Sequence, residues 1–171
     1  MKLQTRIIFP LFIVGSFSLV TATVGCKKSN SSSGAGTQMT ATINGTAWAN
    51  NVPVQGLYTQ SFGISAFELV GGYYKGGDTT AFAIQFNSPF VLHTAISSDT
   101  ASVDIGYINS TTLAEYDGGS TAGHSLLTIS SLDSVNHKII GTFSGVLYNV
   151  TGGSDSLVIT NGTFNTGYTV Q

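Results

Sequence analysis

Three histidines, His93, His124 and His137, are the side chains of this 171-residue chain that could serve as bases near neutral pH. Nucleophilic hydrolysis needs a nucleophile, a base and an orienting acid that converge in space. Serine and aspartate are frequent enough that almost any triad can be drawn, so a triad carries no information. Neither a Gly-x-Ser-x-Gly elbow nor a His-Glu-x-x-His motif occurs. We therefore expect no catalytic residue, and a hydrolase ranks third among the functions considered.

Metal binding also has weak support in the residue pattern. The three histidines share no i, i+4 spacing of the kind that brings two zinc ligands to one helix face. Calcium requires clustered oxygen ligands. The segments 75–78 (Lys-Gly-Gly-Asp) and 117–119 (Asp-Gly-Gly) are more simply interpreted as turns, in which glycine supplies a positive φ. We expect no metal and no cofactor.

Aromatic side chains offer the more serious binding hypothesis. Seven Tyr, ten Phe and one Trp make up 11% of the chain. Rings on a sheet face can stack on the apolar faces of sugars, and Tyr and Trp also donate hydrogen bonds. The alternative is that the same rings pack in the core. Tyr73 and Tyr74 are adjacent, so in a strand they face opposite sides. The candidate ligand-binding residues are Trp48, Tyr58, Tyr73, Tyr74, Tyr107 and Tyr116.

Four aspartates are followed directly by Ser or Thr and then by an aliphatic residue or Thr. This pattern resembles the acceptor motif of the general O-glycosylation system of Bacteroidota. The alternative is that Asp-Ser and Asp-Thr begin turns in a chain rich in Ser and Thr. The resemblance implies candidate O-glycosylation at Thr79, Thr100, Ser134 and Ser156.

The N-terminus has the form of a secretory signal. Lys2 and Arg6 precede an uncharged apolar stretch that ends in Val24-Gly25-Cys26, and Cys26 is the single cysteine of the chain. A lone cysteine cannot form an internal disulfide. It is a spare thiol, half of an intermolecular disulfide, or the lipidated first residue of a lipoprotein. The segment resembles a bacterial lipoprotein signal, which implies cleavage after residue 25 and lipidation of Cys26. The competing interpretation, an uncleaved transmembrane anchor, is disfavoured by the four Ser or Thr and two Gly within residues 7–25.

Residues 26–38 combine the candidate lipid anchor with a Ser- and Gly-rich tether that has no apolar periodicity. Lys27 follows the cysteine, where an Asp often marks retention in the inner membrane. The pattern therefore resembles that of an outer-membrane lipoprotein. The periplasmic and cell-surface faces of that membrane both remain open.

Residues 39–171 are expected to form one β domain. Gly, Ser and Thr are abundant, charged residues are 8%, and no segment has a helical apolar period. This part contains two cations, Lys75 and Lys138, and eight acids, for a net charge of 2 − 8 = −6. Such a domain cannot neutralise a run of phosphates, so nucleic acid is excluded as a partner.

Strand signals recur at short intervals along this domain. Asn44-Gly45 lies between two apolar runs and predicts a hairpin, and Phe82, Ile84 and Phe86 alternate on one face, as do Val103, Ile105 and Tyr107. A short helix is compatible with 97–116. Turns are expected around Asp133, Gly152-Gly153 and Asn161-Gly162. Nine to ten antiparallel strands should close as a β-sandwich or a flattened barrel. The clearer strand candidates are 40–43, 46–48, 62–74, 80–86, 125–130, 138–149, 156–160 and 163–170, and the weaker ones are 90–96, 101–108 and 111–116.

Both ends of the domain carry a family resemblance. Residues 39–48 fit an "A-x-I-N-G-x-x-W" opening, and 140–148 with 157–164 fit the closing strands, of small β-rich lipoproteins of Bacteroidota that have no known function. The middle, 54–121, has no counterpart. The resemblance implies a secreted, lipid-anchored β-sandwich and supplies no catalytic residues. We expect a non-catalytic binding or structural module at the cell envelope, with a carbohydrate- or lipid-binding protein that has an aromatic-lined site as the alternative.

Overall fold

The computed structural model describes residues 37–61, 63–100, 102–119 and 123–171. The predicted signal peptide, Cys26 and most of the tether lie outside these residues. The described part is all β apart from one 3₁₀ turn, η1 (Ser98–Thr100). Its strands are β1 (Gln38–Ile43), β2 (Thr46–Ala49), β3 (Val52–Ser61), β4 (Ile64–Lys75), β5 (Asp78–Ser88), β6 (Ala95–Ser97), β7 (Val103–Asn109), β8 (Ala114–Asp117), β9 (His124–Asp133), β10 (Lys138–Asn149), β11 (Ser156–Gly167) and β12 (Thr169–Val170).

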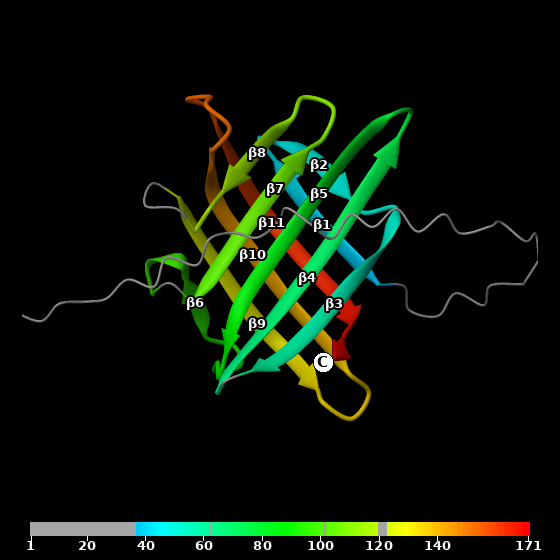
Figure 1. Cartoon of the computed structure of the whole chain (residues 1–171), viewed down its shortest axis with the longest axis vertical. Coiled ribbons are helices and arrows are strands. Elements are labelled where there is room, and N and C mark those ends of the chain that lie inside the picture. Colours follow the sequence, from blue (N-terminus) through cyan, green and yellow to red (C-terminus); the bar gives the residue numbers. More distant parts are fainter. Residues whose placement is uncertain (1–36, 62, 101, 120–122) are drawn as a thin grey trace, which may run out of the picture. The chain divides into compact units, whose positions relative to one another are not determined.

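All the strands belong to one sheet, which curls into a half-barrel (Figure 1). The order is β12-β3-β4-β5-β7-β8-β10-β11-β1-β2, and β9 pairs with β10 and β6 beside this path. Every pairing is antiparallel except that of β12 with β3. Because β12 follows β11 after the single residue Tyr168, one length of chain links strands from opposite ends of the path. The all-β prediction is confirmed, and its architecture is a single curled sheet rather than two separate layers.

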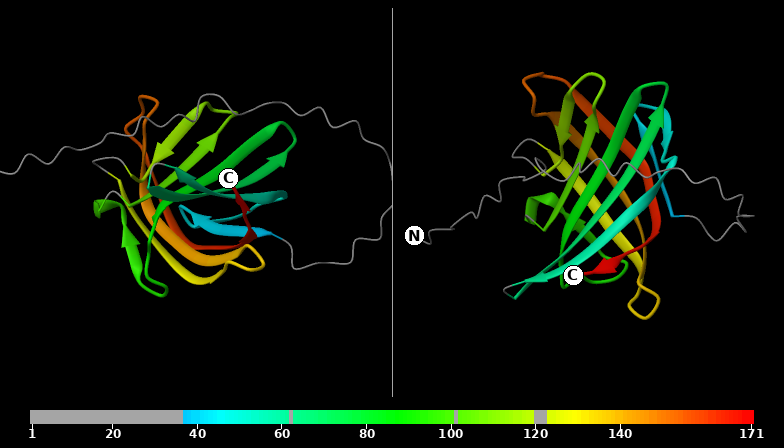
Figure 2. Two further views of the ribbon diagram at one scale, coloured as in Figure 1. Left: turned by 60° about the horizontal axis from the view of Figure 1, so that its bottom comes forward. Right: turned by 45° about the vertical axis from the view of Figure 1, so that its right-hand side comes forward.

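The core lies inside the curl of the sheet. Figure 2 shows the strands β3, β4, β5 and β7 forming one wall and β9, β10 and β11 the other. Period-2 alternation places one side chain of each pair inward, and the rings of Phe82 on β5 and Phe143 on β10 meet 5.4 Å apart across the interior. The largest fully buried side chains are Met39, Leu69, Phe82, Ile84, Phe86, Ile105, Leu127, Ile129, Ile139, Leu147, Ile159 and Phe164.

The N-terminal hairpin forms as the sequence predicts. Asn44 and Gly45 both have positive φ, 48° and 83°, as a two-residue hairpin turn requires, and β1 pairs with β2 through Ala41 opposite Trp48. The Asn44 side chain also accepts a hydrogen bond of 2.7 Å from the backbone N–H of Val158. This bond attaches the turn to β11.

The second Asn-Gly pair behaves differently, and the predicted turn there is wrong. Residues 156–160 and 163–170 were expected to be separate strands, but β11 runs unbroken from Ser156 to Gly167. Asn161, with φ 52°, instead lies in a β-bulge: Phe143 faces Gly162 and Gly145 faces Ile159, so β11 has one extra residue. A residue with positive φ is compatible with a β-bulge as well as with a turn. Because β11 is paired with a strand on each side, the chain continues here and forms a bulge.

Three further boundaries differ from the expectation. The predicted strand 90–96 is mostly a loop, and only Ala95–Ser97 pairs, with β9. Strand β3 was not anticipated, because Pro53, Gln55, Gly56 and Gln60 interrupt its apolar alternation. The short helix allowed within 97–116 is η1. Within the described residues, no helix has the length and apolar character needed to cross a membrane.

Candidate functional site

Three of the six aromatic candidates gather at one end of the core. Trp48 packs edge-on against Phe82 with ring centroids 4.8 Å apart, Phe82 contacts Tyr107 at 4.9 Å, and Tyr107 lies 6.3 Å from Tyr116. Nε1 of Trp48 donates a hydrogen bond of 2.9 Å to Oγ1 of Thr80, which is also the hydrogen-bond partner of Tyr107. Tyr107 and Tyr116 are 8% and 9% exposed. These rings pack in the core, and their polar atoms form internal hydrogen bonds.

Tyr116 ends in a polar network at the β10–β11 loop. Its hydroxyl donates a hydrogen bond of 2.6 Å to Oδ2 of Asp155, and the side-chain amide of Asn149 donates to Oδ1 of Asp155 at 2.8 Å. These bonds lower the pKa of Asp155, and the same carboxylate raises the pKa of Tyr116. Oδ1 of Asn149 in turn accepts the backbone N–H of Thr151. The network holds the loop to the end of the barrel wall.

The other three aromatic candidates lie apart from this cluster. Tyr58 packs on Phe67 at 4.6 Å and on Tyr168 at 6.4 Å, in a separate group of rings. Tyr73 is half-buried on β4, whereas Tyr74 is 59% exposed, as opposite faces of one strand require. The six residues therefore do not line one common site.

The histidines do not converge either. Nδ1 of His124 lies 3.4 Å from the Asp99 carboxylate, and Oγ of Ser97 donates to the same carboxylate at 3.0 Å. Both members of the His124–Asp99 pair are exposed at the surface. His93 is exposed in the β5–β6 loop, and His137 lies at the β9–β10 turn, where its ring contacts Tyr168 at 5.3 Å. Within the described residues, no group of three or more His, Cys, Asp or Glu side chains is placed to hold a metal ion.

One carboxyl group, that of Asp104, has a raised pKa because of burial and a neighbouring carboxyl group. Asp104 on β7 and Asp117 on β8 are hydrogen-bonded to each other, and desolvation together with this neighbour raises the pKa of Asp104 to about 7. Gly119 makes the contact possible, because a Cβ there would lie 2.6 Å from Oδ1 of Asp104. The two carboxyl groups form a structural contact beside the 118–119 turn.

The four candidate acceptor residues differ in accessibility. Thr100 and Ser134 are exposed, whereas Thr79 and Ser156 are half-buried within β5 and β11. Asp133 accepts the backbone N–H groups of Val135 and Asn136, both at 2.9 Å. Asp133 therefore has the turn-forming role that was weighed as the alternative.

The outer face of β9, β10, β11 and β1 carries a row of threonines that the sequence analysis missed. Thr128 faces Thr142, Thr142 faces Thr163, and Thr163 faces Thr40, so one threonine from each of four neighbouring strands stands at the same level. Neighbouring strands are about 4.8 Å apart, so the four side chains follow one another across the sheet. The hydroxyls of Thr163 and Thr40 approach each other to 2.8 Å. Ala95 and Ala49 extend the row at its two ends. We call Thr128, Thr142, Thr163 and Thr40 the threonine row.

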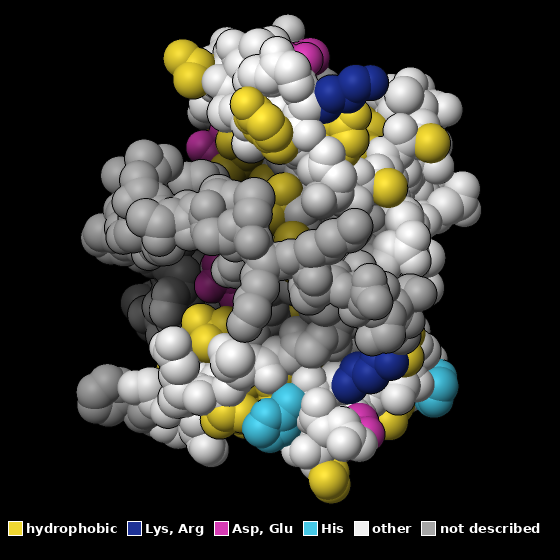
Figure 3. Space-filling model, turned by 90° about the vertical axis from the view of Figure 1, so that its right-hand side faces the viewer, with side chains coloured by type: hydrophobic (Ala, Val, Ile, Leu, Met, Phe, Trp, Pro, Cys, Tyr) yellow, Lys and Arg dark blue, Asp and Glu magenta, His cyan; other side chains and the backbone are white. Residues whose placement is uncertain are grey.

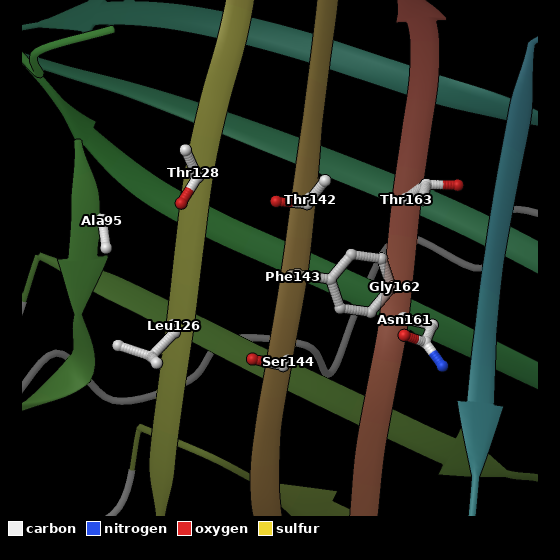
Figure 4. Close-up of a pocket in the computed structure, with 9 residues that line it drawn as sticks. All are labelled: Ala95, Leu126, Thr128, Thr142, Phe143, Ser144, Asn161, Gly162 and Thr163. Carbon is white, nitrogen blue, oxygen red and sulfur yellow. The ribbon is translucent and has the colours of Figure 1, made fainter. Parts of the chain in front are cut away.

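A shallow groove of about 460 Å³ lies on this face (Figure 4). Three members of the threonine row line it, together with Leu126, Ser144 and Asn161. The β11 bulge at Asn161 is part of its wall, in agreement with the tendency of bulges to re-aim side chains beside binding sites. Among the residues that the structure describes, the side chains of Thr128, Thr142, Ser144 and Asn161 make no hydrogen bond, and Thr163 bonds only to Thr40, at 2.8 Å.

No charged side chain lines the groove. Charges are sparse over the rest of the described surface too, and on the face shown in Figure 3 the few basic side chains lie close to acidic ones. The groove therefore offers neutral hydroxyl and amide groups beside one aliphatic side chain, Leu126. Such a lining can exchange hydrogen bonds with an uncharged polar ligand and has no partner for an ionic one.

The signal that could have revealed this site is the repeated Thr-x-Ser/Thr pattern at 40–42, 128–130 and 142–144. Each such pair points two hydroxyls to the same face of a strand. Whether these pairs align in one row depends on the pairing register of the neighbouring strands, which the sequence does not show. No protein-family model matches this chain, and searches of the curated proteins and of the solved structures also give no match.

Proposed function

We propose that this chain is a lipid-anchored, non-catalytic binding module of the bacterial cell envelope, with its binding surface on the outer face of β9–β11. The observation that carries the binding role is the groove in which four polar side chains have no protein partner while the domain's charges lie elsewhere. Thr142 and Asn161 are exposed and Thr128 and Ser144 are half-buried, so their hydrogen-bonding groups are open to a ligand in the groove.

The alternative, a carbohydrate or lipid site lined by aromatic rings, has less support. Trp48, Tyr107 and Tyr116 use their rings for packing and their polar atoms for internal hydrogen bonds. Tyr74 is exposed, but no other aromatic candidate contacts it. A hydrolase has less support again, because among the described residues no serine is hydrogen-bonded to the histidine of the exposed His124–Asp99 pair.

The lipid anchor is supported by the sequence up to Cys26. Attachment to the outer membrane is proposed because Lys27 after the cysteine resembles the pattern of outer-membrane lipoproteins. The test is expression of the full chain and its Cys26→Ala variant in a Bacteroidota host, with radiolabelled palmitate and separation of membranes. The native chain should incorporate label and sediment with outer membranes, and the variant should do neither. Label retained by Cys26→Ala would contradict the anchor. Protease treatment of intact cells distinguishes the surface from the periplasmic face.

O-glycosylation is proposed for the exposed acceptors. Ser134 and Thr100 are exposed, and the Thr100 hydroxyl donates a hydrogen bond of 2.7 Å to the Ser97 carbonyl. Thr79 and Ser156 lie within paired strands. Peptide mass spectrometry of the protein from its native host should find hexose-containing mass on the Ser134 or Thr100 peptide first. Peptides that all have their unmodified mass would refute the proposal.

A further inference from the structure

We infer that the groove over the threonine row binds an uncharged glycan chain. This inference rests on the proposed binding function and names the class of ligand. Its basis is the coincidence of three features at one place: a hollow of about 460 Å³, unpaired hydroxyl and amide groups, and an absence of charge in the lining.

The hydrogen-bonding chemistry of the lining matches that of a sugar. Each threonine hydroxyl is one donor and two acceptors, and its hydrogen can rotate to suit its partner. Asn161 adds an amide that both donates and accepts. A polyhydroxylated ligand likewise presents groups that donate and accept. In each contact, either the protein or the ligand can therefore be the hydrogen-bond donor. A carboxylate or phosphate polymer could use only the donors, and the acceptors would then face its charge.

The electrostatics of the domain also select against charged polymers. The described residues include two lysines, Lys75 and Lys138, and eight acids. Lys75 lies at the β4–β5 turn, away from β9–β11, and Lys138 lies at the start of β10, several residues from Thr142. An anionic polymer in the groove would gain no ion pair and would be repelled by the acidic domain as a whole. A cationic polymer would find its partners outside the groove.

The row geometry suits a chain rather than a single small molecule. The side chains of Thr128, Thr142 and Thr163 stand side by side on three neighbouring strands (Figure 4), and adjacent strands are about 4.8 Å apart. An extended glycan also presents hydroxyl groups at a regular interval along its length. Leu126 lies beside this row and supplies an apolar contact for a pyranose face. The glycan is therefore expected to run across the strands, parallel to the row.

The test is affinity electrophoresis of the full chain, extracted in non-ionic detergent, through gels that contain one soluble polysaccharide each. The panel consists of a β-glucan, an α-glucan, a xylan, a galactomannan and the anionic polygalacturonate. Three variants accompany the native protein. Thr142→Val removes one hydroxyl without changing shape, Thr142→Arg fills the groove, and Thr59→Val makes the same change at an exposed threonine on β3, on the other wall. Circular dichroism verifies that all three remain folded.

At least one neutral polysaccharide should retard the native protein. Thr142→Val should weaken that retardation about five- to tenfold, since one hydrogen bond is lost, Thr142→Arg should abolish it, and Thr59→Val should leave it unchanged. The inference is overturned if no neutral polysaccharide retards the native chain, or if Thr142→Arg binds as well as the native chain. If polygalacturonate alone retards the native chain, and Thr142→Arg abolishes that retardation, the inference that the ligand is an uncharged glycan is overturned. The proposed binding function would remain in place. Membrane attachment through Cys26 is measured separately and does not enter this assay.

Discussion

Nε1 of Trp48 donates a hydrogen bond of 2.9 Å to Oγ1 of Thr80, joining the N-terminal hairpin to β5 across 32 positions of sequence. The indole also packs edge-on against Phe82, so a residue that could have been a ligand platform instead holds β2 against the core. Because Thr80 is also a hydrogen-bond partner of Tyr107, one hydroxyl serves two aromatic side chains.

Replacing Trp48 with Phe should therefore destabilise the domain. The change keeps a ring beside Phe82 but removes the indole N–H, and it leaves Thr80 with one partner fewer. The expected loss is about 1–2 kcal/mol of unfolding free energy, measured by urea denaturation. Tyr74→Phe at an exposed position serves as the control and should change stability by less than about 0.5 kcal/mol. Equal losses in the two variants would mean that the bond to Thr80 contributes nothing.

Asp104 should make stability fall as the pH rises. Its pKa in the folded state is about 7, above the ordinary value of 3.8, so the folded protein holds this proton more tightly than the unfolded chain. The contribution of this proton to the free energy of unfolding is fully present below about pH 4 and is lost as the pH rises towards 7. Above about pH 7 it falls no further. Asp104→Asn should remove this slope and raise stability at pH 8 by about 1 kcal/mol, after discounting for partial exposure. Urea midpoints across this range measure it; parallel pH profiles for both proteins would refute it.

The Tyr116–Asp155 bond predicts the opposite slope in acid. Because hydrogen bonds from Tyr116 and Asn149 lower the pKa of Asp155, its contribution to stability is present above the ordinary pKa of 3.8 and is lost as the pH falls. Tyr116→Phe removes the first of these donors. Stability near neutrality should then fall while stability at low pH is nearly unchanged, so the acid limb of the profile should become shallower. A limb as steep as that of the native protein would show that the bond does not persist in solution.

Two glycines within strands should respond differently to the same substitution. A Cβ at Gly141 would lie 2.5 Å from both the ring of Phe164 and the backbone oxygen of Thr128, whereas at Gly72 the nearest atom, on Val52, is 3.7 Å away. Gly141→Ala should cost about 2 kcal/mol or more because the overpacked atoms belong to the core and backbone. Gly72→Ala should be neutral within about 0.5 kcal/mol. Thermal melts of the two variants measure the difference, and similar shifts would contradict the close packing at Gly141.

The two Asn-Gly pairs illustrate how far the sequence can predict this fold. At Asn44-Gly45 the flanking runs pair with each other, so local turn chemistry was sufficient. At Asn161-Gly162 the same dipeptide lies between β10 and β1, whose pairing keeps the strand continuous and converts the predicted turn into a bulge. The buried alternation of Val103, Ile105 and Tyr107 was predictable because it is local. The threonine row was not, since it depends on the register of four strands from 40 to 163.

The bulge itself gives the last prediction. Asn161 has φ 52°, a conformation that glycine and asparagine adopt readily and that a β-branched residue resists. Asn161→Gly should preserve the bulge and leave stability within about 0.5 kcal/mol of the native value, while Asn161→Val should lose about 1–2 kcal/mol. Chemical denaturation of both variants measures these values. Because Asn161 also lines the groove, Asn161→Gly removes its amide from the binding surface without disturbing Thr142 and Thr163. If the groove binds glycan, this variant should fold normally yet be retarded less than the native chain, which separates the structural role of the left-handed residue from the role of its side chain.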